Sequence, residues 1–468
     1  MSYGVKSLVV AGLSGGSGKS VVAVGLVAAL RGPARQVVPF KKGPDYIDAG
    51  WLTTAAGRPC YNLDPYLMSP EAIADSFQRH CAGADFAVIE GNRGLYDGVN
   101  VEGGFSTAEL AIQLDLPVLL VVNCSKTTRT VAAMVLGCRE LDHRLQIGGV
   151  ILNQIATPRH ESIIRQSVER ITAIPVMGIV PRMRKDIFPM RRLGVTPPQE
   201  YGTAGAAVSE LAEIAGKYFD LEAIDNLMRP VASVQTAAAA RQALACEEPV
   251  TIGVLRDRAF QFYYEENLEA LRGAGARLVM IDALSAPALP AGLDGLYIGG
   301  GFPETSARQL ADNIGFRDSV RQEAEKGLPI YAECGGLIFL GRAIVIDGTE
   351  YPLAGVFPVT FGISRKPQAH GYSIFSADQA NPFYPQHTRV RGHEFRYSTV
   401  LEWDGKPDDL VLNIERGTGF MGGRDGLVKN NVMALYTHVL ATGTKEWAPG
   451  LIRAATRYQG QRPRGDEG

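Results

Sequence analysis

The stretch "AGLSGGSGKS", residues 11–20, connects an apolar segment to a helix-prone segment. The residues "SLVVAGL" at 7–13 are typical of a buried strand, and "VVAVGLVAAL" after the stretch is typical of a helix. A glycine-rich turn ending in Gly-Lys-Ser at such a junction is typical of a phosphate-binding loop, because its backbone N–H groups and the helix N-terminus face the phosphate oxygens. The usual loop has four residues between its outer glycines, whereas Gly12 and Gly18 enclose five. We therefore predict a nucleotide site with an uncommon spacing.

The loop suggests a role for each of its residues. Backbone N–H groups of the turn can bind phosphate oxygens, Lys19 can reach the β and γ phosphates, and the Ser20 hydroxyl can hold Mg²⁺. We expect ATP to be bound by Gly15, Gly16, Ser17, Gly18, Lys19 and Ser20.

Acidic residues accompany the loop. Glu90 ends the apolar strand "FAVIE", while Asp45 and Asp48 lie in the loop "KKGPDYIDAG". An acid at the carboxyl end of a parallel strand beside a phosphate loop points into the ligand crevice. We expect Ser20, Asp45 and Glu90 to hold Mg²⁺. The sequence leaves open which acids bind metal and which bind substrate, and a solvated loop is an equal alternative for Asp45 and Asp48.

Length and composition limit the classes of function. The chain has 468 residues, of which 46% are hydrophobic and 21% charged, as in a globular protein of two domains. Its 47 Lys and Arg against 49 Asp and Glu give a net charge of -2, so we expect no nucleic-acid partner. Apolar runs are shorter than the roughly 18 residues of a membrane span, and the N-terminus lacks a cleavable signal, so we expect a cytoplasmic protein. The six cysteines form no CxxC pair, which argues against zinc and against disulfides.

Strand and helix patterns alternate along both halves of the chain. Continuous apolar runs lie at residues 7–13, 86–91, 117–123 and 147–154, and a second such rhythm starts at Val250. This predicts an α/β protein of two domains, each with a mainly parallel sheet flanked by helices. We expect a first domain at 1–228, a linker at 229–248, a second domain at 249–456 and a disordered tail at 457–468.

A second candidate site lies in "LPIYAECGGLIFLGRA", residues 328–343, where Cys334 stands between an apolar strand and a helix. Such a turn exposes a nucleophile, and the two following glycines leave room for backbone N–H groups that stabilise an oxyanion. A catalytic cysteine needs a histidine that folding brings near. Three later histidines have a suitable context: His370, His393 and His438.

The N-terminal half resembles a known family. The spacing of the phosphate loop is similar to that of dethiobiotin-synthetase-like ATPases, and "FKKGPDYIDAGW", "IEGNRGLYDGVN" and "STAEL" closely resemble the cobyrinic acid a,c-diamide synthases of cobalamin biosynthesis. The resemblance implies a P-loop NTPase-like domain that phosphorylates a corrinoid carboxylate, which ammonia then converts to an amide. It implies that Asn153 contacts adenine. We expect the substrate to be bound by Tyr46, Asp48, Asp97, Arg191 and Arg192.

The C-terminal half resembles the class I glutamine amidotransferase domain of cobyrinic acid and cobyric acid synthases, which has a flavodoxin-like fold. In that family the cysteine attacks the glutamine amide, and the family's histidine maps onto His438. The "GLYIGGGFPE" segment implies that backbone at Gly300 or Gly301 completes an oxyanion hole with the N–H of Gly335, and we expect Gly301 to do so. The "GHEFRYS" segment implies a structural or substrate-facing His393. Many class I amidotransferases orient the histidine with a glutamate two residues later, but position 440 is a leucine, as in the corrinoid subtype. What holds the imidazole stays open, and we expect a modest glutaminase rate.

Together the two sites predict an ATP-driven, glutamine-dependent amidoligase that acts on the a and c carboxylates of cobyrinic acid, with Mg²⁺ as cofactor and a homodimer as a possible assembly. One alternative is the enzyme that amidates nickel sirohydrochlorin. Another is a ParA-like or MinD-like ATPase that acts as a binding module, and a third is an inactive amidotransferase scaffold. The "KKGPDYID" form argues against cobyric acid synthase, and intact Cys334 and His438 argue against the scaffold.

Overall fold

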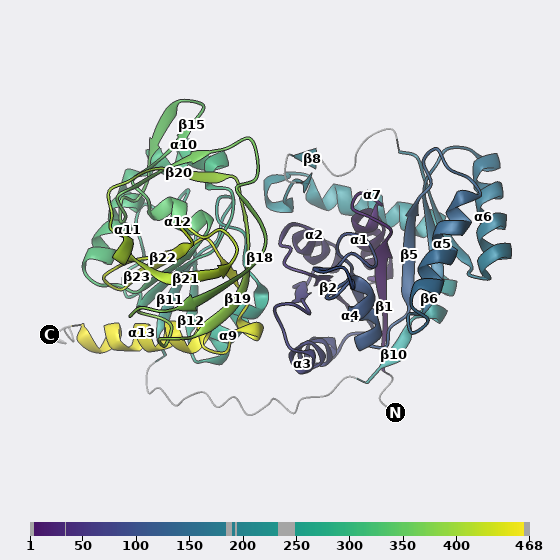
Figure 1. Cartoon of the computed structure of the whole chain (residues 1–468), viewed down its shortest axis with the longest axis horizontal. Coiled ribbons are helices and arrows are strands. Elements are labelled where there is room, and N and C mark those ends of the chain that lie inside the picture. The colour runs from purple at the N-terminus through teal and green to yellow at the C-terminus, as the bar shows by residue number, and fades with distance from the viewer. Residues whose placement is uncertain (1–3, 33, 184–189, 192–193, 233–248, 463–468) are drawn as a thin grey trace. The chain divides into compact units, whose positions relative to one another are not determined.

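The chain folds as two compact units, Met1–Ala239 and Ala240–Gly468 (Figure 1). This computed structural model describes residues 4–32, 34–183, 190–191, 194–232 and 249–462. Among these residues, no helix is both long and apolar enough to cross a membrane.

The first unit is built on a sheet with the strand order β3-β2-β4-β1-β5-β6-β7, in which all neighbours run parallel. The strands are β1 (Val5–Gly12), β2 (Val37–Lys42), β3 (Tyr61–Leu63), β4 (Phe86–Glu90), β5 (Val118–Asn123), β6 (Ile147–Ile155) and β7 (Val176–Pro181). The flanking helices are α1 (Lys19–Leu30), α2 (Ile47–Ala56), α3 (Pro70–Cys81), α4 (Thr107–Gln113), α5 (Thr130–Leu141), α6 (Pro158–Thr172), α7 (Ala204–Tyr218) and α8 (Leu221–Leu227). The predicted parallel α/β domain is confirmed.

Strand register brings the candidate residues of this unit together. Val10 of β1 and Lys41 of β2 both pair with Glu90 of β4. Because parallel strands end at the same edge of a sheet, the loop after β1 starts beside Lys41 and Glu90. A further strand, β10 (Arg229–Val231), pairs antiparallel with the first residues of β1. Those residues were expected to begin the linker, but their backbone hydrogen bonds make them part of the first sheet.

The second unit contains a ten-stranded sheet with the order β12-β11-β13-β14-β23-β22-β21-β18-β19-β24. Its parallel strands are β11 (Thr251–Leu255), β12 (Arg277–Ile281), β13 (Gly295–Ile298), β14 (Ile330–Glu333) and β23 (Val432–Leu435). Its antiparallel extension comprises β18 (Ala369–Ala377), β19 (Arg389–Arg396), β21 (Leu410–Arg416), β22 (Arg424–Lys429) and β24 (His438–Val439). The parallel half follows the predicted rhythm, whereas the antiparallel extension was not predicted from the sequence.

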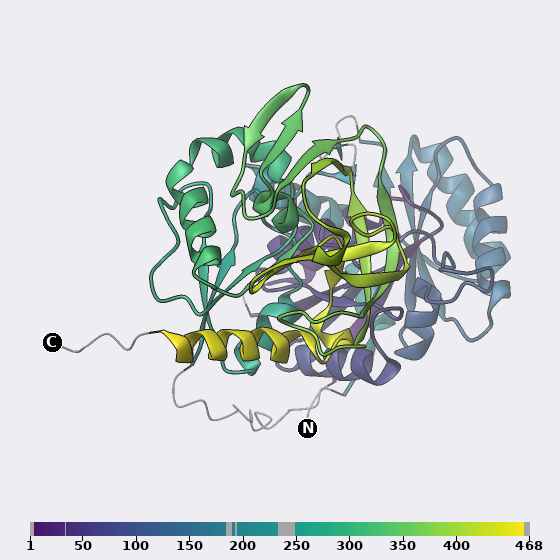
Figure 2. The same ribbon diagram turned by 60° about the vertical axis from the view of Figure 1, so that its left-hand side comes forward.

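Helices and a small sheet complete the second unit (Figure 2). The helices are α9 (Glu265–Gly273), α10 (Ala307–Asp312), α11 (Ile314–Glu325), α12 (Gly335–Leu340) and α13 (Trp447–Gln461). The small sheet has the order β16-β15-β17-β20, from β15 (Ala343–Ile346), β16 (Thr349–Pro352), β17 (Val359–Ile363) and β20 (Ser398–Trp403). Alternate residues of the central strands belong to two separate apolar clusters: Ile330 and Ala332 to one, Tyr331 to the other. The sheet is therefore buried on both faces.

The C-terminal helix is longer than expected. We expected a disordered tail from residue 457, yet α13 continues to Gln461. Tyr458 packs against the apolar core, and Gln459 Nε2 donates to Asp294 Oδ2 at 3.4 Å. Arg462 forms an ion pair with Asp294 at 3.0 Å. These contacts keep the last helical turns on the domain.

Core packing around α11 can be tested by truncation. Phe316 is fully buried, so Phe316→Ala should lower the free energy of unfolding of the second unit by about 3–5 kcal/mol. Ile314, on the same helix, is 59% exposed, and Ile314→Ala should change it by less than about 0.5 kcal/mol. Chemical denaturation of both variants checks this, and similar losses in the two would contradict the described packing.

Candidate active sites

The glycine-rich loop between β1 and α1 has the backbone that a phosphate loop requires. Gly16 and Gly18 have φ angles of 76° and 93°, which favour glycine. A Cβ at Gly18 would also lie 2.0 Å from Nδ2 of Asn153. Gly15 and Gly16 are exposed, and a Cβ at either would meet nothing within 4 Å. Their backbone thus borders open space in which phosphate oxygens can be accommodated.

Asn153 supports this loop from β6. Its Nδ2 donates to the Ser17 carbonyl at 2.9 Å, and its Oδ1 accepts from the Gln154 N–H at 2.8 Å. Only 4% of the residue is exposed. The amide that we expected to contact adenine therefore holds the loop, and adenine contact stays a prediction.

Lys19 lies folded against the same loop. Its Nζ donates to the Ser14 carbonyl at 3.0 Å, and Ser17 Oγ donates to that carbonyl at 2.9 Å. Burial, together with the nearby charge of Lys41, lowers the pKa of Lys19. Its ammonium is thus partly desolvated, which strengthens its attraction to an incoming anion.

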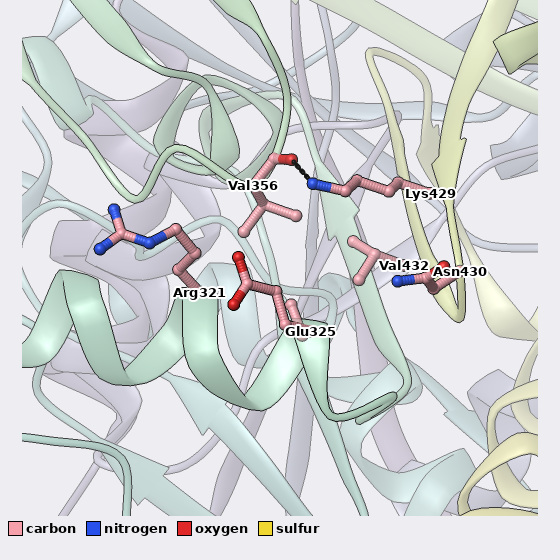
Figure 3. A pocket seen from close by; sticks show the side chains of 7 residues that line it. Arg321, Glu325, Val356, Lys429, Asn430 and Val432 are labelled. Carbon is pink, nitrogen blue, oxygen red and sulfur yellow. Dashed lines mark hydrogen bonds between the residues drawn. The ribbon is translucent and has the colours of Figure 1, made fainter.

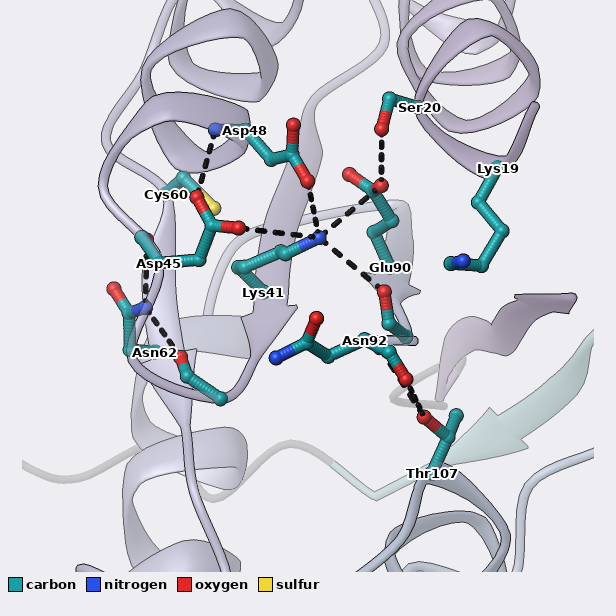
Figure 4. A network of polar contacts seen from close by, with 12 residues as sticks. Lys19, Ser20, Lys41, Asp45, Asp48, Cys60, Asn62, Glu90, Asn92 and Thr107 are labelled. Carbon is teal, nitrogen blue, oxygen red and sulfur yellow. Dashed lines mark hydrogen bonds and ion pairs between the residues drawn. The ribbon is translucent and has the colours of Figure 1, made fainter. Parts of the chain in front are cut away.

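Lys41 is at the centre of a cluster of carboxylates (Figure 4). Its Nζ lies 2.6 Å from Asp48 Oδ2, 3.2 Å from Glu90 Oε1 and 3.9 Å from Asp45 Oδ2. Its side chain is only 1% exposed. Burial alone would lower the pKa of Lys41, but the three carboxylates outweigh burial and raise it. Lys41 was not among the predicted site residues, although a lysine inside the buried strand "VVPFKK" was a usable signal.

The pKa values of the carboxylates around Lys41 are shifted in different directions. Burial and the charge of Asp48 raise the pKa of Glu90 to about 7 and that of Asp45 to about 6. Burial would also raise the pKa of Asp48, but the ion pair with Lys41 outweighs it and lowers the value. The ion pair with Lys41 thus favours the ionised form of Asp48 in particular.

The residues expected to hold Mg²⁺ are partly assembled. Ser20 Oγ donates to Glu90 Oε1 at 2.8 Å, while Glu90 Oε2 is buried with no hydrogen-bond partner among the described residues. A hydroxyl, a carboxylate oxygen without a partner and the nearby Asp45 suit a hard cation that prefers oxygen ligands. In the described part of the chain, no group of three or more His, Cys, Asp or Glu is already arranged around a metal position.

The structure describes the predicted substrate-binding residues to different extents. Tyr46 is the N-cap residue of α2, next to Asp45. Asp97 is exposed and accepts from the Gly94 N–H at 2.8 Å, as in a turn. Arg191 belongs to the short strand β8 (Met190–Arg191), and its side chain is not described. Arg192 lies outside the described residues.

The second site is centred on Cys334, between β14 and α12. The residue has φ 45° and ψ −95°, a strained conformation for a side chain with a Cβ. A Cβ at Gly336 would lie 2.6 Å from the Ile298 carbonyl, and one at Gly335 would lie 2.9 Å from the Gly301 nitrogen. The turn therefore needs both glycines, and it brings the backbone of Gly335 next to the Gly301 N–H. These are the two groups that we expected to form an oxyanion hole.

His438 lies beside Cys334. Register pairs His438 with His393, and the two rings stack with centroids 4.9 Å apart. Cys334 and Glu333 both interact electrostatically with the His438 side chain, and His438 Nδ1 lies 3.4 Å from Glu333 Oε2. Burial would lower the pKa of His438, but the contacts with Cys334 and Glu333 outweigh it and raise the pKa to about 10. Of the three candidate histidines, His438 has the arrangement of a catalytic dyad with Cys334.

His393 has a different environment. Burial and the adjacent His438 lower its pKa well below the usual value, so its ring is neutral. Its Nδ1 lies 3.2 Å from the Tyr264 hydroxyl. A neutral, buried ring packed under His438 fits the expected structural role better than that of a base.

A separate hollow of the second unit lies away from these residues (Figure 3). Lys429 Nζ donates there to the Val356 carbonyl at 3.1 Å. The hollow is lined by Arg321, Ala324, Glu325, Val356, Lys429, Asn430 and Val432. It shares no residue with either candidate site.

Each half of the chain matches a family model. Residues 8–190 match the CobQ/CobB/MinD/ParA nucleotide binding domain, and residues 251–446 match the CobB/CobQ-like glutamine amidotransferase domain. The fold and both sites thus define a protein that joins a nucleotide-binding domain to a glutamine amidotransferase domain.

Full-length relatives specify the family. A cobyrinate a,c-diamide synthase of Magnetococcus marinus is 40% identical over 97% of this chain and 98% of its own length. The cobyrinate a,c-diamide synthase of Dehalococcoides mccartyi is 37% identical over 96% of this chain, and that of Archaeoglobus fulgidus is 36% identical over 97%, in each case with 98% of the relative covered. The chain belongs to the family of cobyrinate a,c-diamide synthases, which confirms the resemblance seen in the sequence.

The contact between Gly300 and His438 allows a direct test of the dyad. A Cβ at Gly300 would lie 2.4 Å from His438 Cε1, so Gly300→Ala should displace the imidazole. Because the thiolate is the reactive form, alkylation of Cys334 by iodoacetamide at neutral pH should slow by roughly 10-fold or more. Mass spectrometry of the Cys334 peptide measures the rate. In the control, Gly295→Ala, the nearest atom would be 3.6 Å away, and equal rates in the two variants would contradict the dyad.

Proposed function

We propose that this chain uses ATP and glutamine to amidate the a and c carboxylates of cobyrinic acid. The observation that carries the proposal is the similarity to cobyrinate a,c-diamide synthases over nearly the whole chain, up to 40% identity over 97% of its residues. The dyad in one unit and the phosphate loop in the other support it. ATP and glutamine are cytoplasmic metabolites, and we place the reaction in the cytoplasm. A homodimer remains part of the proposal.

The second unit supplies ammonia. The Cys334 thiolate attacks the side-chain amide carbon of glutamine, and the N–H groups of Gly335 and Gly301 stabilise the oxyanion that forms. The imidazolium of His438 gives its proton to the departing nitrogen, so that ammonia leaves and a thioester remains. Water then attacks the thioester while His438 takes up a proton, and glutamate is released with the thiolate restored.

The first unit activates the acceptor. A corrinoid carboxylate attacks the γ-phosphorus of ATP and becomes an acyl phosphate, and ADP leaves. Ammonia then displaces phosphate and forms the amide. The step is needed because oxide is a very poor leaving group, whereas phosphate is a good one. The backbone of residues 15–18 and the Lys19 ammonium bind the phosphates and stabilise the charge that develops during transfer.

Mg²⁺ would be held by the Ser20 hydroxyl, Glu90 and Asp45, and when bound it neutralises phosphate charge. Lys41 keeps the carboxylates of this cluster close together, so that their repulsion is compensated before the metal arrives. We assign Asp48, Tyr46 and Asp97 to the corrinoid side, together with Arg191 and Arg192. Asn153 positions the loop and remains a candidate for adenine contact.

Two substitutions should separate the half-reactions. Cys334→Ala should abolish glutamine-driven amidation of cobyrinic acid and leave ammonium-driven amidation intact. Glu90→Gln should reduce amidation from either nitrogen source by about 100-fold or more while glutamine hydrolysis persists. The amide products are measured by mass spectrometry. The control, Cys81→Ala, removes a buried cysteine of α3 outside both sites and should retain both activities.

The same assay compares substrates. Nickel sirohydrochlorin, run in parallel with cobyrinic acid, decides between the two macrocycles. Amidation of neither macrocycle with either nitrogen source would refute the proposed substrate, and ATP hydrolysis without any glutamine hydrolysis would favour a nucleotide-switched binding module.

A further inference from the structure

The catalytic histidine needs a group that fixes its orientation. Many class I amidotransferases place a glutamate two residues after the histidine, but here that position is Leu440, which is fully buried. A carboxylate nevertheless faces the imidazole from another direction: Glu333, the last residue of β14 and the immediate neighbour of Cys334, lies with Oε2 3.4 Å from His438 Nδ1.

Glu333 contacts both the ring and the backbone of the histidine segment. Its second oxygen, Oε1, accepts from the Val439 N–H at 3.3 Å. The Glu333 and His438 side chains are 1% and 2% exposed, so water competes little for this contact. Asn267 holds the same segment, because its Nδ2 donates to the Val439 carbonyl at 2.8 Å and its Oδ1 accepts from the Ala441 N–H at 2.7 Å.

We propose that Glu333 is the positioning residue of the dyad and orients His438 from the strand that carries the nucleophile. This inference rests on the proposed glutaminase function. Strand register provides the geometry: Glu333 pairs with Leu435 of β23, and the Cys334 N–H donates to the Leu435 carbonyl at 2.8 Å. The segment after β23 therefore returns His438 to the end of β14.

The contact determines which ring nitrogen carries the proton. In its ionised form the Glu333 carboxylate only accepts hydrogen bonds, so its approach to Nδ1 favours the neutral His438 tautomer that carries its proton on that nitrogen. Nε2 is then free to take the Cys334 proton, which leaves a thiolate and an imidazolium. Burial raises the pKa of Glu333, while its contacts with His438 and the Val439 N–H act to lower it and favour the ionised form, which stabilises the imidazolium.

Apart from the Cys334 thiolate, Glu333 is the main group that stabilises the positive charge of the His438 imidazolium. From β14 and the turn after it, Glu333 and Cys334 face His438. From β19, His393 stacks on the ring as a neutral imidazole, and Glu394 lies within electrostatic range. Removing the Glu333 charge should therefore lower the pKa of His438 from its raised value of about 10.

The test is Glu333→Gln in the full chain, assayed for glutamine hydrolysis without ATP or corrinoid. We expect kcat to fall by about 100-fold or more with little change in KM. Hydrolysis requires imidazolium to protonate the leaving nitrogen, so the alkaline limb of the pH profile should move to lower pH. Glu333→Asp keeps a carboxylate, so it should restore part of kcat and move the alkaline limb part of the way back toward the wild-type pH. Ammonium-driven amidation should be unchanged in both variants.

Asp294→Asn is the matched control, because Asp294 is also a buried carboxylate that accepts a backbone N–H, that of Thr251 at 2.7 Å, just before β13. It should leave kcat and the pH limb unchanged. A Glu333→Gln variant that keeps the wild-type kcat and the wild-type alkaline limb overturns the inference. The inference is also overturned if Glu333→Asp has no higher kcat than Glu333→Gln and the alkaline limb is not shifted. Failure of the wild type itself to hydrolyse glutamine refutes the proposed function instead.

A second measurement does not depend on how the Glu333 variants fold. In Cys334→Ala with ¹⁵N-labelled histidine, NMR should report His438 protonated on Nδ1 and not on Nε2 when the ring is neutral. A proton on Nε2 would overturn the proposed orientation.

Discussion

Each site of this chain contains a buried basic side chain beside one or more carboxyl groups. In the first unit the Lys41 ammonium lies between Asp48, Glu90 and Asp45, and in the second the His438 imidazole lies against Glu333. A buried charge is tolerated when an opposite charge compensates its lost hydration, and removing one partner of such a pair costs about 3–5 kcal/mol. The strands that end at the two sites must therefore remain in register for these charges to stay paired.

The register explains how unrelated parts of the chain form each site. Pairing of β2 and β4 puts Lys41 opposite Glu90, and pairing of β14 and β23 puts Glu333 opposite Leu435. In both cases the acid is the last residue of a buried parallel strand, where the side chain leaves the sheet and can face a ligand. The same geometry leaves a strained Cys334 at the start of α12, and the neighbouring glycines allow that backbone. Fold and chemistry thus depend on the same strand ends.

Much of this was readable from the sequence. Continuous apolar runs predicted the parallel strands, and the phosphate loop, Glu90 and Cys334 were found because each lies at the end of such a run. The motifs also carried the family resemblance that the full-length relatives confirm. The antiparallel extension of the second sheet was missed because partly exposed strands such as β18, with its mixed burial pattern, lack a strong apolar signal.

The charged partners inside the sites were harder to find. Lys41 and Glu333 act through contacts with residues 49 and 105 positions away, Glu90 and His438, and no local pattern fixes such pairings. Both were visible as charged residues in otherwise apolar strands, which indicates a compensating partner without naming it. For Asn153, the position on a strand was predicted from the sequence. Its hydrogen-bond partner, the Ser17 carbonyl, was not, because that contact depends on the path of the loop in the folded chain.

The proposed function requires that this chain move nitrogen from glutamine to a tetrapyrrole carboxylate. The most direct measurement supplies glutamine labelled with ¹⁵N in its side-chain amide, ATP, Mg²⁺ and cobyrinic acid, without ammonium, and analyses the product by mass spectrometry. We expect a doubly amidated product that carries two ¹⁵N atoms in the wild type, and no product in Cys334→Ala. Hydrolysis of both glutamine and ATP without label in the corrinoid would contradict it.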